Sequence, residues 1–289
     1  MTFSEKTAAA VLSLLITLLT FITVISLLLG STFSDPDFMI GVLEKHDYYD
    51  HIFDEYSEAL EDLAVPSGVP AGRFTAVVTK AELSAAVNAT VRSAYSVDVS
   101  YAGEAVNSET VYNRFYDCLC EVAIESGYKI NDDLIPALQN VAELCTETYK
   151  TYATLPFIDT IGSYAVEFDR IFKIAEISCT AFLVFFLFLL FVRKALRKNA
   201  AAVFALSFNT VGFMLSIAPI AVFASGKIKY LNISIRSLYN FAVGYSSSVL
   251  YLILNCGITF LLVGCGFVAL HFFLTKKKTS AEHFERIQK

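Results

Sequence analysis

Apolar residues gather in four long runs, and a helical periodicity replaces them between the first run and the second. The runs cover Ala8–Gly30, Ile174–Val192, Ala200–Ala224 and Val249–Phe273. Each is close to the roughly 20 apolar residues with which an α-helix crosses a bilayer. The first run exceeds the roughly 7–15 apolar residues of a secretory signal core, so we interpret it as an uncleaved span. The pattern therefore predicts four transmembrane helices.

The intervening segment, about residues 31–170, is predicted to consist of amphipathic helices. In residues 38–64 apolar positions recur at spacings of three and four, which predicts one helix with a single buried stripe. This stripe is Met39, Val42, His46, Tyr49, Phe53, Tyr56, Leu60 and Leu63. Prolines and glycines in 64–72 end the helix, and "TKAE" at 79–82 predicts a capping box that opens the next one.

Three further helical stretches follow. The first runs from about Ser108 to Ser126, and the second is expected to be capped by Asn131 or Asp132. The third begins near Phe157 and meets no helix breaker before Arg193, so it includes the second apolar run. A single long helix is therefore expected to join this segment to the membrane.

Lysine and arginine near the spans predict the orientation, because cytoplasmic loops carry an excess of them. The richest stretches are "RKALRK" at 193–198 and the tail 275–289. With both termini in the cytoplasm these two stretches are inside, and 31–170 is outside. We therefore predict a multi-pass protein of the cell (plasma) membrane.

The predicted fold class is an all-α membrane protein with a one-plus-three arrangement of four transmembrane helices. An all-helical extracytoplasmic domain separates the first span from the other three. The predicted division is 1–30 (N-terminus and first span), 31–170 (external domain), 171–274 (three spans, with a short external loop near 225–240) and 275–289 (basic cytoplasmic tail).

Composition and charge support a membrane protein whose external domain is acidic. Hydrophobic residues make up 55% of the chain and charged residues only 17%, which is unusual for a soluble domain. Residues 31–170 carry 24 Asp and Glu against 8 Lys and Arg, a net charge of −16 compared with −6 for the whole chain. Such a surface repels nucleic acid, so we expect none among the partners. It favours cations or basic partners, although it also suits a helical domain that only needs to stay soluble.

The stretch "EKHDYYDHIFDE" at 44–55 contains the side chains that are most suited to metal binding or catalysis. On one helix, Asp47, His51 and Asp54 share a face and could bind a divalent ion, although a zinc site needs three or four converging ligands. A solvent-exposed helix face without a metal ion carries the same residue types, and we prefer this interpretation to a metal site. His46 lies near the apolar stripe, where a hydrogen-bonded histidine is expected rather than a ligand. No cofactor is expected.

Two other groups of residues invite structural interpretations. Cys118 and Cys145 fall on the inward faces of their helices, where they could form a disulfide outside the cytoplasm or remain reduced core residues. Asn209 and Asn255 are polar positions within predicted spans, and each could form an interhelical hydrogen bond.

Motifs for catalysis are absent from the sequence. It contains no P-loop, GxGxxG, GxSxG or HExxH pattern, and no carboxylate or arginine at mid-membrane depth. We therefore expect a non-enzymatic membrane protein whose acidic external domain binds a partner or senses an external signal. A protein partner or a second copy of the chain is expected.

Residues 35–70, "DPDFMIGVLEKHDYYDHIFDEYSEALEDLAVPSGVP", resemble the start of the external region in uncharacterised bacterial multi-pass membrane proteins with a helical extracytoplasmic domain. The resemblance implies no established activity. The one-plus-three layout is also similar to ABC permeases of the lipoprotein-export and cell-division type, which implies the alternative of a permease-like or accessory subunit of an export complex. This chain departs from those permeases in its short "RKALRKN" loop and its all-helical external segment.

Overall fold

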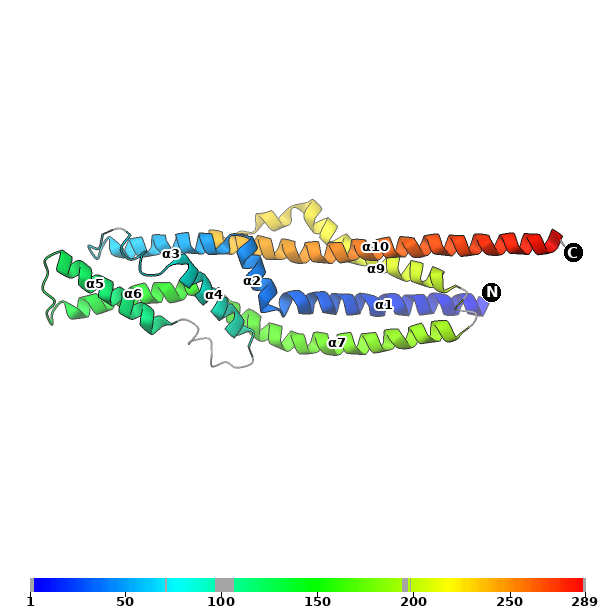
Figure 1. Ribbon diagram of the computed structural model, residues 1–289, viewed down its shortest axis with the longest axis horizontal. Helices are drawn as coiled ribbons and strands as arrows, with labels where there is room; N and C mark the ends of the chain where they lie inside the picture. The colour runs from blue at the N-terminus through cyan, green and yellow to red at the C-terminus, as the bar shows by residue number, and fades with distance from the viewer. Residues whose placement is uncertain (1–2, 71, 97–106, 194–196, 198, 288–289) are drawn as a thin grey trace. The chain divides into compact units, whose positions relative to one another are not determined.

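The computed structural model describes residues 3–70, 72–96, 107–193, 197 and 199–287, and it contains no strand within them (Figure 1). The described helices are α1 (Phe3–Phe33), α2 (Pro36–Lys45), α3 (Tyr48–Ala64), α4 (Lys80–Ala94), α5 (Ser108–Glu125), α6 (Ile135–Ala153), α7 (Ile158–Val192), α9 (Ala200–Ser225), the 3₁₀ turn η2 (Lys227–Tyr230) and α10 (Arg236–Ile287). The predicted all-α fold is confirmed.

The chain divides into two compact units. The apolar unit comprises residues 1–32, 169–231 and 246–289, and the acidic unit comprises residues 33–168 and 232–245. Helices α7 and α10 each contribute residues to both units.

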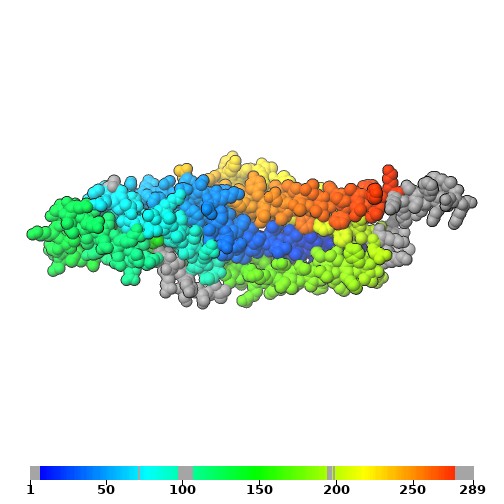
Figure 2. Space-filling model, in the orientation of Figure 1, coloured from blue at the N-terminus to red at the C-terminus, as the bar shows by residue number. Residues whose placement is uncertain are grey.

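Four helical stretches are long and apolar enough to cross a membrane, as predicted. They lie within Thr7–Phe33, Ile135–Val192, Ala200–Ser225 and Arg236–Lys276. Helices α7 and α10 present long surfaces (Figure 2) with many large exposed apolar side chains. Among these are Phe182, Phe185, Phe188, Leu262, Phe272 and Phe273. Such exposure is costly in water and is favourable in lipid.

Within the apolar unit, α1 packs against α7 and α9. Leu12 and Ile16 of α1 form a buried cluster with Leu190 of α7 and Val203 of α9. Beside it the Ser13 and Ser207 hydroxyls lie 3.1 Å apart, and the Ser207 hydroxyl also donates to the Ser13 carbonyl at 3.1 Å. Small side chains of this kind allow membrane helices to approach closely and to hydrogen-bond across the interface.

Helices α9 and α10 come into close contact at glycine residues. A methyl group on Gly264 would lie 2.9 Å from the backbone nitrogen of Asn209, and one on Gly212 would lie 2.8 Å from the carbonyl oxygen of Gly257. By contrast, nothing lies within 4 Å of the corresponding position on Gly266. Stacked phenylalanine rings, such as Phe204 on Phe267 with centroids 5.2 Å apart, extend the same interface.

In the acidic unit, α6 is the central helix, because it contacts α3, α4 and α5. Its inward face is wholly or almost wholly buried, and its members are Leu138, Ala142, Cys145, Thr146, Tyr149 and Ala153. Tyr56 of α3 meets the rings of Tyr149 and Tyr152 edge-on, at centroid distances of 6.3 and 5.9 Å. Aromatic packing therefore joins α3 to the central helix.

The single helix predicted over 38–64 is wrong, because the chain breaks between α2 and α3. Asp47 has a φ of +55°, a left-handed conformation that aspartate adopts more readily than most residues. Beyond this point Tyr56 and Leu60 are buried as predicted. Tyr48, Ile52 and Ala64 are buried in place of Tyr49, Phe53 and Leu63.

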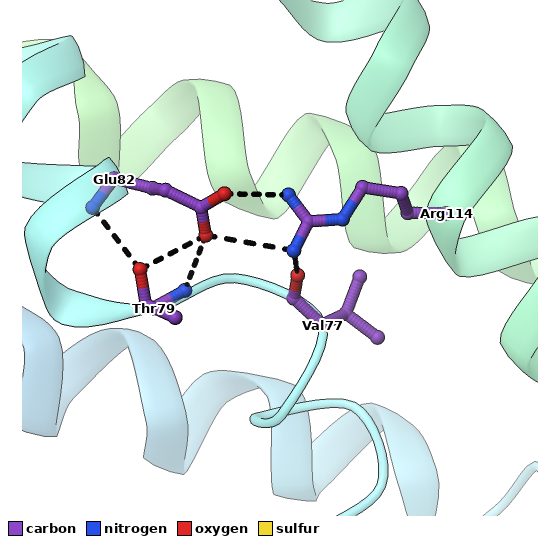
Figure 3. A network of polar contacts seen from close by, with 4 residues as sticks. All are labelled: Val77, Thr79, Glu82 and Arg114. Carbon is purple, nitrogen blue, oxygen red and sulfur yellow. Dashed lines mark hydrogen bonds and ion pairs between the residues drawn. The ribbon is translucent and has the colours of Figure 1, made fainter.

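The predicted capping box at the start of α4 is confirmed, and it belongs to a larger polar network (Figure 3). The Thr79 hydroxyl accepts a hydrogen bond from the Glu82 backbone N–H, and the Thr79 backbone N–H donates to the Glu82 carboxylate at 2.8 Å. The Arg114 guanidinium of α5 donates to this carboxylate at 2.8 Å and to the Val77 carbonyl. Arg114, followed by Thr79, lowers the pKa of Glu82 to about 2.

We expect Gly264→Ala to destabilise the α9–α10 interface by about 1–3 kcal/mol, because the new methyl group meets the α9 backbone. The matched control is Gly266→Ala, where the methyl group enters open space. The thermal stability of both variants is measured in detergent from the loss of the size-exclusion peak on heating. Equal melting of the two variants would contradict this account of the interface.

We expect Glu82→Gln to cost about 1 kcal/mol at neutral pH, a value reduced because the Glu82 side chain is 46% exposed. Glutamine keeps the capping-box acceptor and loses the charge. Because folding depresses the pKa of Glu82, its contribution is complete above about pH 4.5 and is lost as the pH falls toward 2.

The stability difference between wild type and Glu82→Gln should therefore shrink on acidification, as measured by thermal melts followed by circular dichroism at pH 7, 4 and 3. Glu143→Gln, an exposed position of α6, is the control. A difference that stays constant across this pH range would show that the charge of Glu82 is irrelevant.

Candidate functional site

An open cleft of about 600 Å³ lies in the acidic unit between α3 and the first turn of α10. We call it the α3–α10 cleft. Three segments line it: one side of α3, the end of α6 with the connection to α7, and the start of α10 with the two residues before it. The lining residues are Tyr48, His51, Ile52, Asp54, Glu55, Glu58, Ala59, Asp62, Thr151, Tyr152, Thr154, Pro156, Ser234, Ile235, Arg236, Ser237 and Leu238. Its volume lies within the range of small-molecule sites.

The α3 wall of the cleft is acidic. Asp54, Glu58 and Asp62 follow one another at intervals of four residues and are all exposed. This interval keeps the three side chains on one helix face, with a rise of about 6 Å from each to the next. With Glu55, the cleft contains four carboxylates against one guanidinium, that of Arg236. A strongly negative potential follows from this composition.

Glu55 differs from the other three carboxylates because it binds the N-terminus of α10. The Ser237 backbone N–H donates to one Glu55 oxygen at 2.9 Å, and the Ser237 hydroxyl donates to the other at 2.6 Å. Ser237 is wholly buried, and the first N–H groups of a helix have no partner within the helix. The carboxylate also interacts favourably with the positive end of the helix dipole. Glu55 therefore anchors α10 to α3.

The next two turns of α10 pack onto α2 and α3. Phe241 meets Tyr48 edge-on with centroids 6.2 Å apart, and Tyr245 meets Phe38 at 5.8 Å. Gly244 lies directly against the His46 ring, where a methyl group would fall 2.9 Å from Nδ1. His46 is thus a packing residue, and its buried Nε2 has no hydrogen-bond partner among the described residues.

Two tyrosines of α3 carry buried hydroxyls without a described hydrogen-bond partner. These are Tyr48, which lines the cleft, and Tyr56, which lies in the core. Burial is the main cause that raises the pKa of Tyr48, and the nearby Glu55 charge raises it further. Both phenols are therefore neutral donors or acceptors at physiological pH. An unsatisfied hydroxyl at a cleft wall can bond to a ligand group.

The three residues considered for a metal ion do not come together. His51 and Asp54 line the cleft, whereas Asp47 lies in the break before α3 and does not. Across the part of the chain that the structure describes, no group of three or more His, Cys, Asp or Glu side chains could hold a metal ion. The predicted shared face depended on an unbroken helix through Asp47.

Cys118 and Cys145 are free thiols in this structure. Cys145 is wholly buried, and burial raises the pKa of its thiol to about 12, with a further contribution from Cys118. Cys118 is half-buried, and its Sγ lies 3.9 Å from the Arg73 carbonyl oxygen. A disulfide between them stays a prediction.

The polar positions within the spans differ in their surroundings. Asn209 lies at the glycine contact: its amide donates to the Ala205 carbonyl at 2.7 Å, and Cys265 of α10 lies 3.9 Å from its carbonyl oxygen. Asn255 is exposed, and its backbone carbonyl accepts from Thr259. Asn209 thus contacts the neighbouring helix.

Sequence reasoning missed the cleft itself. The i, i+4, i+8 repeat of Asp54, Glu58 and Asp62 is visible in the sequence, but an exposed helix shows the same pattern without a site. Ser237 lies 182 residues from Glu55, and no local pattern marks it as a partner.

We expect Ser237→Ala to loosen the first turns of α10, because the Glu55 carboxylate loses its hydroxyl donor in a buried setting. The expected loss of local stability is about 1–2 kcal/mol. Hydrogen-exchange mass spectrometry of the full chain should show faster exchange in residues 236–245. Ser234→Ala, at an exposed position before the helix, is the control and should exchange at the wild-type rate.

Comparisons with protein families, with curated proteins and with solved structures found no match to this chain, so its site is interpreted from its own residues.

Proposed function

We propose that this chain is a non-enzymatic protein of the cell membrane whose acidic helical domain lies outside the cell and binds a partner or senses an external signal. Both termini are cytoplasmic in this proposal, as the basic segments 193–198 and 275–289 favour. The four apolar helices are the membrane anchor.

The observation that carries the proposal is the composition of the α3–α10 cleft. Its walls come from α3 and from the first residues of α10, and α10 then continues as one helix from Arg236 through the apolar run Val249–Phe273. A ligand in the cleft therefore touches the end of a membrane helix directly. Occupation of the cleft can change the Glu55–Ser237 anchor, which is how binding would be transmitted along α10.

A role without catalysis fits the chemistry of the cleft. Its polar groups are carboxylates, hydroxyls, one guanidinium and His51, and no cysteine is among its lining residues. Binding needs charge and shape that complement a ligand, and the cleft offers four carboxylates and a volume of about 600 Å³. In this proposal the apolar helices of the other unit anchor the binding domain to the membrane.

Cysteine labelling in intact cells tests this function. In a background with the six native cysteines replaced by alanine, checked to elute like the wild type, one cysteine is introduced at Ala81, Ile235 or Lys276. Ala81 and Ile235 are exposed in the acidic unit, and Lys276 lies near the end of the apolar stretch of α10. A membrane-impermeant maleimide should label the first two in intact cells and Lys276→Cys only after permeabilisation.

The same variants test sensing. Ile235 lines the cleft and Ala81 does not, so external solutes that occupy the cleft should slow labelling at 235 and leave labelling at 81 unchanged. Labelling of Ala81→Cys only in permeabilised cells would place the domain inside and overturn the proposal. A labelling rate at 235 that is identical in fresh and conditioned medium would contradict sensing.

A further inference from the structure

We propose that the α3–α10 cleft binds a linear polyamine, whose ammonium groups pair with the carboxylates of α3. This inference rests on the proposed function, because the polyamine would be the external ligand of the acidic domain. The charge balance of the unit, the spacing of the carboxylates and an unsatisfied phenol in the cleft wall support it.

The charge balance of the acidic unit leaves four carboxylates in the cleft with one cationic side chain among the lining residues, that of Arg236. Five basic side chains of the unit are paired elsewhere, in the ion pairs Arg73–Glu125, Lys80–Asp50, Arg92–Asp37, Arg114–Glu82 and Lys150–Glu147. Asp54, Glu58 and Asp62 form no ion pair with any described residue. Three unpaired carboxylates on one helix face repel each other, and a cationic ligand would relieve this repulsion.

Spacing decides between a metal ion and an extended cation. The three carboxylates extend over about 12 Å of helix, too far for all three to converge on one ion, and no described group could hold a metal. Amine nitrogens separated by three or four methylene groups span a distance similar to the rise of about 6 Å between successive carboxylates. A linear polyamine can therefore place successive ammonium groups beside successive carboxylates.

The wall of the cleft offers further contacts to such a ligand. Tyr48 is wholly buried, lines the cleft, and has a hydroxyl without a described partner. An ammonium group carries donors only, and the phenol oxygen can accept from it. The Tyr152 ring also lines the cleft and can attract a cation, while Ile52 and Ala59 give the methylene segments an apolar surface.

Two sources could supply closely spaced ammonium groups: a free polyamine, or neighbouring lysine side chains of a peptide. The single-file row of carboxylates favours the free polyamine, because a peptide backbone would add bulk beside α3, where Thr151, Thr154 and Pro156 also line the cleft. Both sources are therefore included in the test.

Calorimetric titration of the purified full chain in nanodiscs with spermidine tests the proposal. Glu58→Gln should weaken binding about three- to tenfold, because the central carboxylate loses its charge. Glu61→Gln is the matched control: it removes an exposed carboxylate of the same helix outside the cleft and should change the Kd less than about twofold.

A second pair of variants tests the phenol. Tyr48→Phe should weaken spermidine binding about threefold or more, because the ligand loses its neutral acceptor. Tyr56→Phe removes the other buried hydroxyl without a described partner, in the core rather than in the cleft, and should leave the Kd unchanged. Circular dichroism of each variant verifies that the fold is retained.

Competition separates the ligand classes. At constant ionic strength, Mg²⁺ should not displace spermidine, and trilysine should bind more weakly than spermidine. Displacement by Mg²⁺, tighter binding of trilysine, or equal Kd values for Glu58→Gln and Glu61→Gln would each overturn the polyamine assignment. External labelling of Ala81→Cys tests the proposed function independently, so a domain that is outside but does not bind spermidine refutes only this inference.

Discussion

The attachment of the first turn of α10 to α3 is the interaction on which the cleft depends. One carboxylate, Glu55, receives both the backbone N–H and the hydroxyl of Ser237, and this satisfies the start of a helix that would otherwise bury unpaired donors. This contact and the packing of Phe241 on Tyr48 hold the second wall of the cleft in place. The cost of burying Ser237 is offset by its two hydrogen bonds to Glu55.

The residues of α3 have three different roles, and helix geometry separates them. Tyr48, Ile52, Tyr56 and Leu60 repeat every four residues and bury one face against the core. Glu55 lies toward α10, and Asp54, Glu58 and Asp62 remain on the open side of the cleft. One short helix therefore provides packing, an anchor and a charged wall, because each role occupies a different side of the same cylinder.

The helices were largely predictable from local patterns, and the site was not. The capping residue Thr79 and the uninterrupted run after Phe157 predicted α4 and α7, because these signals act within a few residues. The break at Asp47 was missed because aspartate is tolerated in helices and no glycine or proline marks the turn. That one break removed Asp47 from the face of His51 and Asp54, and beyond it Tyr48 is buried rather than Tyr49.

By itself the sequence determined that the chain is helical, that four of its stretches can cross a membrane, and that the intervening segment is strongly acidic. These properties depend on composition and on periods of a few residues, so they are visible locally. Only the tertiary structure decided which carboxylates form a cleft, which one anchors α10, and which glycines of α10 face α9. Those outcomes depend on pairs such as Glu55 and Ser237, which are remote in the sequence and meet only after the helices pack.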